Sequence, residues 1–179
     1  FIDSGHTTLI SLATELGLRA IDLVDTQRGL VKDTFFLEGR RFSLAQLIAD
    51  FAPLASKINS DLGAIGDNIS YQDFTEPAER LDNLSIAEYV NQADTSTIVR
   101  QLLRIAYTTE YGRDPEEQSA LNLLFLIGAE TGSFELYGDS DERYQIDGGN
   151  SQIVNRLADR LSGSIETGTI LEAITFLPD

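Results

Sequence analysis

The chain has 179 residues, of which 42% are hydrophobic, enough for one globular domain with a buried core. Its formal net charge of −16 would repel a phosphate backbone, so nucleic acid is not expected as a partner. The absence of cysteine excludes disulfides and thiolate metal sites but leaves the cellular compartment open. The longest apolar run, around residues 123–127, is far shorter than the roughly 20 residues of a membrane helix, so no membrane span is expected.

A helix, a hairpin and a longer helix are predicted in the first third of the chain. Apolar residues recur at helical spacing from Thr7 to Leu16, and Gly17 supplies the stop. Two short β runs from Thr34 to Phe42 surround a turn that contains glycine. A capping box at Ser43, completed by a glutamine three residues later, opens a helix that runs to about residue 62. Pro53 is expected to kink this helix or make its middle irregular.

The middle of the chain combines a predicted linker with a short helix. Residues Gly63 to Asn83 are polar and are interpreted as a linking stretch. Ser85 and Glu88 have the spacing of a second capping box, which predicts a helix from Ile86 to Asn91.

Two longer helices are predicted next. Asp94 or Thr95 can cap the first, which continues to about residue 111 and ends at Gly112. The second begins in the run Asp114 to Glu117, which combines a capping aspartate, a proline in the first turn and acids that favour the helix N-terminus. Its apolar pattern predicts that it runs to about Glu130.

The last part of the chain is predicted to alternate between strand and helix. Arg143 to Asp147 indicate an extended segment, followed by Gly148-Gly149-Asn150 and a helix from Ser151 to about Leu161. The β-branched residues at 165–166 and from Thr169 to Phe176 are typical of strand. The expected fold class is therefore mainly α with a small β component (α+β).

Gly148 and Gly149 form the clearest local motif. Residues without side chains allow a ligand to approach the backbone, and the start of the following helix favours negative groups. A plain strand-to-helix turn explains the same residues equally well. The chain has no GxGxxG and no P-loop, so it is not expected to hold a dinucleotide pyrophosphate alone.

The only histidine, His6, follows Asp3 and Ser4 closely. A catalytic triad is rejected, because triads are assembled from distant loops and no GxSxG elbow is present. The favoured interpretation is a loop or capping residue at the first helix. No carboxylate pair stands out for glycosidase chemistry, and no metal site is expected, because the chain has one histidine, no cysteine and no calcium-loop pattern.

Three stretches, taken in order, resemble the flavin-containing amine oxidase family, which includes monoamine oxidases and L-amino acid oxidases. The resemblance covers most of the chain and is loosest between about residues 29 and 81. The matching stretches are FIDSGHTTLISLATELGL at 1–18, DNLSIAEY at 82–89 with the helices that follow, and ERYQIDGGNSQ at 142–152 with LADRL and IETG after it.

The resemblance implies an enzyme in which FAD takes a hydride from the carbon that bears the amine nitrogen to give an imine, which hydrolyses, and oxygen then reoxidises the flavin to give hydrogen peroxide. The chain lacks methionine and a dinucleotide motif, so we interpret it as the substrate-domain segment of a longer flavoprotein. The partners implied are a small amine and the FAD-binding domain of the same polypeptide. The family's catalytic lysine and aromatic cage lie in later sequence, so no catalytic residue is assigned and the segment alone is expected to be inactive.

The resemblance also assigns roles to eight residues. Phe1, Ile2 and Asp3 are expected near the flavin, as are Gly148 and Gly149. Substrate contacts are expected from the remaining three, which are His6, Asp141 and Arg143. An equally simple alternative is that Arg143 and its neighbour Glu142 only brace the loop. Because amino acid oxidases often place an arginine near the position of His6, histidine there favours an amine without a carboxylate.

In domain terms, residues 1–179 are expected to form a single helical substrate-binding domain, with residues 1–6 and 143–179 at the seams with the FAD domain. Two alternatives remain open. One is a related FAD oxidoreductase such as a carotenoid desaturase or protoporphyrinogen oxidase, and the other is a non-enzymatic acidic helical interaction module. Oligomeric state is not predicted.

Overall fold

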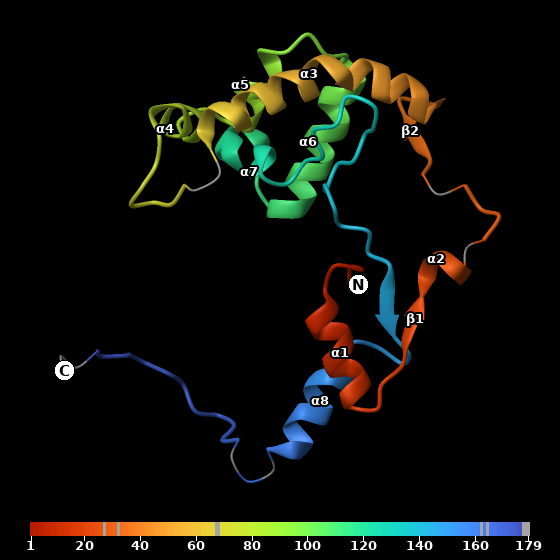
Figure 1. Cartoon of the computed structure of the whole chain (residues 1–179), viewed down its shortest axis with the longest axis vertical. Coiled ribbons are helices and arrows are strands. Elements are labelled where there is room, and N and C mark those ends of the chain that lie inside the picture. Colours follow the sequence, from red (N-terminus) through yellow and green to blue (C-terminus); the bar gives the residue numbers. More distant parts are fainter. Residues whose placement is uncertain (27, 32, 67–68, 162, 164, 177–179) are drawn as a thin grey trace. The chain divides into compact units, whose positions relative to one another are not determined.

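The computed structural model describes residues 1–26, 28–31, 33–66, 69–161, 163 and 165–176 (Figure 1). It divides into two compact units, which we call unit 1 (Phe1–Gly29 with Ser140–Asp179) and unit 2 (Leu30–Asp139). Helices dominate, and the strands of the described residues form two small antiparallel pairs, which confirms the predicted fold class. The expectation of one domain across residues 1–179 stays a prediction.

Unit 1 joins the beginning of the chain to its last third. Strand β4 lies between two partners, because Tyr144 pairs with Ile2 on one side and with Asp22 of β1 on the other. The helices pack around this small sheet through apolar side chains, of which Ile2 and Ile146 are 1% exposed. The elements of unit 1 are α1 (Thr7–Glu15), β1 (Ala20–Asp22), α2 (Leu23–Thr26), β4 (Tyr144–Ile146) and α8 (Ser151–Arg160).

Unit 2 is a helical unit with one hairpin. Its core is formed mainly by α3, α5, α6 and α7, and includes the fully buried Phe51, Tyr89 and Tyr107. The hydroxyl of Tyr89 donates to Asp61 of α3 at 2.8 Å, which joins α5 to α3. The elements of unit 2 are β2 (Phe35–Leu37), β3 (Arg40–Phe42), α3 (Leu44–Ile65), α4 (Glu76–Asp82), α5 (Ile86–Asn91), α6 (Thr97–Tyr111), η1 (Pro115–Glu117) and α7 (Ala120–Leu124).

Most local start and stop signals act as predicted. The hairpin turns at Glu38 and Gly39, both of which have positive φ, as a tight two-residue turn requires. The complete capping box of α5 forms at Ser85, and Gly112 ends α6 in the left-handed conformation. At Ser43 only the serine half of the box forms among the described residues, and α3 continues through Pro53.

Two helix predictions in unit 2 need correction. The stretch 63–83 is not only a linker, because α3 extends to Ile65 and α4 follows, with Thr75 accepting a hydrogen bond from the N–H of Ala78. Proline in the first turn of α4 is a start signal that the polar composition concealed. The cap of α6 is Ser96, not Asp94 or Thr95.

The predicted helix from residue 114 to about 130 is wrong, because it is interrupted at Gln118. This residue is extended and separates η1 from α7. Its carbonyl accepts from the N–H of Ile86 at 3.0 Å, and the N–H of Ala120 donates to Leu84 at 2.8 Å. Pairing with the start of α5 therefore replaces helical bonds at this point.

Strand positions differ from expectation at both ends of unit 1. β1 was not predicted, since it is only three residues long and its partner lies more than a hundred residues later. The predicted strand at 165–166 and 169–176 is absent from the described part of the tail, where side chains such as Ile170 and Phe176 are 83% and 91% exposed. A strand needs a partner for its N–H and C=O groups, and the described residues supply none here. Among the described helices, none has the length and apolarity needed to cross a membrane.

Candidate functional site

The eight residues singled out from the sequence all lie in unit 1, on two segments that the β pairing brings together. The N–H of Ile2 donates to the carbonyl of Tyr144 at 2.7 Å, and the N–H of Tyr144 donates back at 2.8 Å. The backbone of Ile2 is thereby paired and its side chain is buried in the core, whereas Phe1 is 69% exposed. Of the first two residues, therefore, only Phe1 has a side chain free to contact another group.

Asp3 joins the N-terminal segment to the loop that precedes β4. Its Oδ1 accepts from the hydroxyl of Ser140 at 3.0 Å and from the N–H of Glu142 at 2.7 Å. Nδ1 of His6 accepts from the N–H of Asp3 at 3.3 Å, and Nε2 of His6 lies 3.7 Å from Oδ2 of Asp3. The imidazole is 55% exposed, so it keeps room for a ligand while Asp3 fixes its position.

Asp141 is held by Ser4 from the same N-terminal segment. The Ser4 N–H donates to Oδ1 at 2.8 Å and the Ser4 hydroxyl donates to Oδ2 at 2.6 Å. Because both bonds favour the charged form, they hold the pKa of the Asp141 carboxyl below its usual value. Asp141 is consequently a negative charge held against Ser4, the residue that follows Asp3 in the N-terminal segment.

Arg143 forms a hydrogen-bonded ion pair with Asp22 at the end of β1. Its Nε and Nη2 donate to Oδ2 of Asp22 at 3.0 and 2.7 Å, and this lowers the pKa of the Asp22 carboxyl. The other carboxylate oxygen accepts from the N–H groups of Val24 and Asp25 at the start of α2. The geometry thus fits the bracing role of Arg143 directly, and Glu142 takes part through its backbone N–H.

Gly148 and Gly149 form the turn between β4 and α8. Their φ values of +83° and +109° are unfavourable for residues with a side chain. A Cβ at Gly148 would lie 2.7 Å from Nε2 of Gln152, which itself donates to the carbonyls of Asp147 and Gly149. The glycines are therefore required by the turn itself, against which the Gln152 side chain packs.

The structure separates the eight residues into two groups along unit 1. Asp3, His6 and Asp141 are linked at the end of β4 where the chain enters, whereas the two glycines follow the end where it leaves. Sequence reasoning missed Ser4 as the partner of Asp141 and missed Asp22 altogether. Ser4 belongs to the short polar run before the first helix, so it could have been considered as a partner. No local sequence pattern indicated a role for Asp22.

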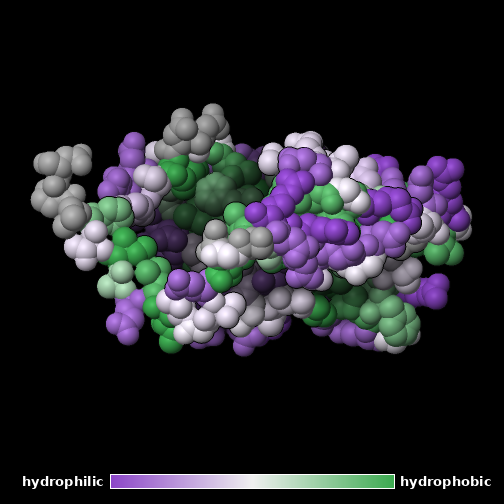
Figure 2. All heavy atoms as spheres, turned by 90° about the horizontal axis from the view of Figure 1, so that it is seen from below, coloured by the Kyte–Doolittle hydropathy of each residue, from purple (hydrophilic) through white to green (hydrophobic). Residues whose placement is uncertain are grey.

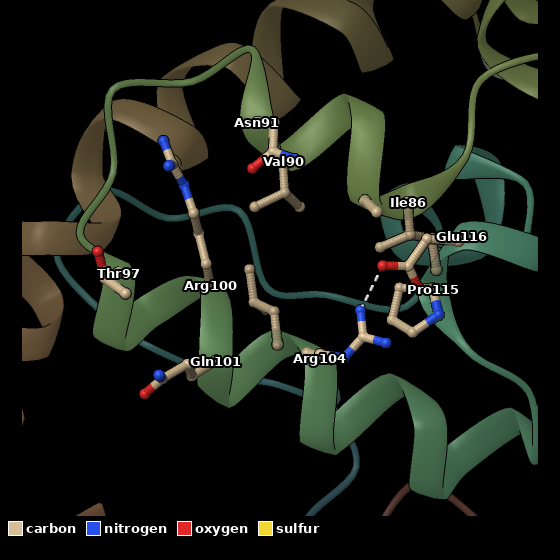
Figure 3. A pocket seen from close by; sticks show the side chains of 11 residues that line it. Ile86, Val90, Asn91, Thr97, Arg100, Gln101, Arg104, Pro115 and Glu116 are labelled. Carbon is tan, nitrogen blue, oxygen red and sulfur yellow. Dashed lines mark hydrogen bonds and ion pairs between the residues drawn. The ribbon is translucent and has the colours of Figure 1, made fainter. Parts of the chain in front are cut away.

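Three surface pockets are lined by residues of unit 2, and none of the eight residues lines any of them. One of about 180 Å³ opens between α5, α6 and η1 and has Arg100 and Arg104 on its wall (Figure 3). Another, of about 520 Å³, is lined by α4, α7 and the preceding loop and includes Phe74 and Phe125. None of these pockets contains a predicted substrate residue. In the described residues, no group of histidine and carboxylate side chains could hold a metal ion. The assignment of a site to unit 1 therefore depends on its hydrogen-bond geometry.

Apolar side chains reach the surface between hydrophilic ones (Figure 2). In unit 1 they include Phe1 and several tail residues, among them Ile170, Leu171, Ile174 and Phe176, each at least 69% exposed. Exposed apolar surface of this extent is typical of segments that are covered by another surface.

Solved amine oxidases share the fold of this chain, whereas no protein-family model and no curated protein sequence matches it. A putrescine oxidase with putrescine bound aligns over 91% of the chain with a TM-score of 0.64 and 20% identity. A cyclohexylamine oxidase from Brevibacterium oxydans aligns over 92%, with a TM-score of 0.63 and 21% identity. The chain spans 37% of the length of each of these enzymes.

Proposed function

We propose that the chain is the substrate-domain part of an FAD-dependent amine oxidase that converts a small amine to an imine with release of hydrogen peroxide. The observation that carries the proposal is the fold likeness to two amine oxidases over more than nine tenths of the chain. The predicted family stretches at 1–18 and 142–152 also meet in unit 1 through Ile2 and Tyr144. In this proposal the remaining parts of the enzyme lie on the same longer polypeptide.

FAD would supply the hydride acceptor, and the residues of this chain would position substrate and cofactor. The turn at Gly148 and Gly149 suits close approach by a cofactor group, because it lacks side chains and precedes the ten-residue helix α8. Phe1 contributes an exposed ring at the other seam. Ile2 and Asp3 act through backbone pairing and loop hydrogen bonds, which would hold Phe1 in place.

The polar residues near His6 favour a substrate that carries positive charge and no carboxylate. Oδ2 of Asp3 lies 3.7 Å from Nε2 of His6, and Asp141 is held ionised by Ser4, two residues before His6 in the chain. The nearest candidate for binding a carboxylate, Arg143, already donates two bonds to Asp22. A carboxylate-bearing amino acid would meet fixed negative charge here, whereas an ammonium group would be attracted.

The proposal is tested by a peroxide-release assay of the full-length protein with primary amines, diamines and amino acids. We expect flavin absorbance in the purified protein and peroxide release that is faster with amines than with amino acids. Flavin without activity on any amine would contradict the amine oxidase assignment and favour a desaturase-like or protoporphyrinogen oxidase-like enzyme. A full-length protein that contains no flavin would contradict both the amine oxidase assignment and the related FAD-enzyme alternatives.

The role of His6 is tested by His6→Arg, with Thr8→Arg as the matched control. An arginine at position 6 introduces a guanidinium fork that suits carboxylates, so kcat/KM for amino acids should rise relative to amines. Thr8 is exposed in the first turn of α1, and arginine there should leave the ratio unchanged. Equal effects from both variants would show that position 6 does not contact substrate.

A further inference from the structure

The pocket between α5 and α6 combines an apolar floor with a positively charged wall. Its floor includes Val90 and Leu103, which are 4% and 1% exposed, and Pro115, which is buried. Arg100 and Arg104 project from α6 at the two ends of the pocket, with Val90 of α5 opposite them (Figure 3). The volume of about 180 Å³ is close to that of an engineered protein cavity, about 150 Å³, that accommodates benzene.

The two arginines differ in their partners. Arg104 is neutralised by Glu116, with Asp114 at 3.7 Å. Within the described residues Arg100 forms no ion pair, and the one hydrogen bond of its guanidinium runs from Nη2 to the carbonyl of Ala93 at 2.9 Å. Its Nε–H is buried without an acceptor. An under-satisfied guanidinium of this kind is stabilised by an additional anionic acceptor at its remaining N–H groups.

We propose that this pocket binds a small monocarboxylic acid with an apolar body. The carboxylate accepts hydrogen bonds from Arg100, while Asn91 and Thr97 supply polar contacts at the rim. The body packs on Val90 and Leu103. The protein has a formal net charge of −16, which repels anions in general. The pocket lining carries net positive charge, so an anion is attracted here and not at the surrounding surface.

This site is separate from the proposed oxidase site, because none of its residues is among the eight assigned to substrate or cofactor. It also has the opposite charge preference. The oxidase proposal favours ammonium groups near Asp141, whereas the Arg100 pocket favours carboxylates.

Calorimetric titration of the protein with benzoate and benzamide tests the proposal. These two probes have nearly the same shape and differ in charge. Benzoate should bind, and benzamide should bind at least about tenfold more weakly, because it lacks the charge-assisted bonds to Arg100. The readout is heat of binding, so its outcome does not depend on flavin or turnover. Absence of benzoate binding, or equal binding of benzamide, would overturn the proposal.

Two variants locate the bound benzoate. Arg100→Met keeps most of the apolar stem and should weaken benzoate at least about tenfold. Ala87→Leu places added volume in the pocket while leaving Arg100 unchanged, and it should also abolish binding. Arg156→Gln, which removes an exposed arginine of α8, should bind benzoate like the wild type. If Ala87→Leu, folded by circular dichroism, retains benzoate affinity, the ligand lies elsewhere and the proposal is wrong.

Discussion

Single hydrogen-bonding residues hold the two segments of unit 1 together. Asp3 receives bonds from Ser140 and Glu142, Ser4 donates to Asp141, and Asp22 receives both bonds from Arg143. Each pair joins residues more than a hundred positions apart. The arrangement of the candidate site is therefore sensitive to single side chains such as Ser4 and Asp22, which are not among the eight residues assigned to substrate or cofactor.

Asp22→Asn should lower the stability of unit 1 at neutral pH. Arg143 lowers the pKa of Asp22 from 3.8, so the folded state favours the carboxylate. This stabilisation is present above the pKa of the unfolded chain and is lost as pH falls through the lower folded value. The difference in melting temperature between wild type and variant should thus be larger at pH 7 than at pH 3.

Asp159→Asn is the control for this measurement. Asp159 is exposed on α8, so its replacement should leave the melting temperature nearly unchanged at both pH values. If the effect of Asp22→Asn is the same at pH 3 and pH 7, the charge of Asp22 does not contribute.

Gly148→Ala and Gly63→Ala should change stability in opposite directions. Gly148 has φ of +83° and its Cβ would approach Gln152 within 2.7 Å, so alanine should destabilise by about 1–2 kcal/mol. Gly63 lies in α3 with nothing near its Cβ position, where alanine should stabilise by up to about 1 kcal/mol. Urea denaturation measures both values. A neutral Gly148→Ala would mean that the turn tolerates another conformation.

At the scale of elements, Gln118 fixes the junction between α6, η1 and α7. Its buried amide donates to the carbonyls of Tyr107 and Arg113 at 3.2 and 2.6 Å. Gln118→Ala leaves both carbonyls without this donor and should destabilise by about 1–3 kcal/mol, as measured by urea denaturation. Gln92→Ala, at the exposed end of α5, should have little effect. Equal losses from the two variants would contradict the role of the Gln118 amide.

Elements whose signals are local could be predicted from sequence, and those set by distant partners could not. The box at Ser85 and the stop at Gly112 act within a few residues, so their helices were predicted almost to the residue. β1 exists because β4 pairs with it, and the extended conformation of Gln118 depends on Ile86 and its neighbours. Neither partner can be identified from a short window of sequence.

The candidate site divides in the same way. The eight residues came from the family resemblance and stay predictions as functional residues, but the structure does bring Asp3, His6 and Asp141 together. The pairings of Ser4 with Asp141 and of Asp22 with Arg143 could not be predicted from sequence, because each joins residues more than a hundred positions apart. The two hydrogen bonds from Arg143 to Oδ2 of Asp22 support the bracing interpretation that the sequence left open.

At the scale of the whole molecule, excess negative charge should make stability depend on salt. The formal net charge of −16 creates repulsion that opposes the folded state. Sodium chloride at about 0.15 M shortens the screening distance to about 8 Å, so the melting temperature should rise between low salt and this concentration. Scanning calorimetry over a salt series measures the effect. A falling melting temperature would mean that surface ion pairs outweigh net repulsion.

The division of unit 1 between the two ends of the sequence affects how the protein is made. Unit 2 is continuous in sequence, so it can fold as soon as its last residue has left the ribosome. By contrast, α1 and β1 are synthesised before unit 2, yet they lack their core partners Ile146 and Ile153 until all of unit 2 has been translated. During this interval their apolar faces are exposed, which makes this segment more accessible to chaperones and proteases than it is in the completed unit 1.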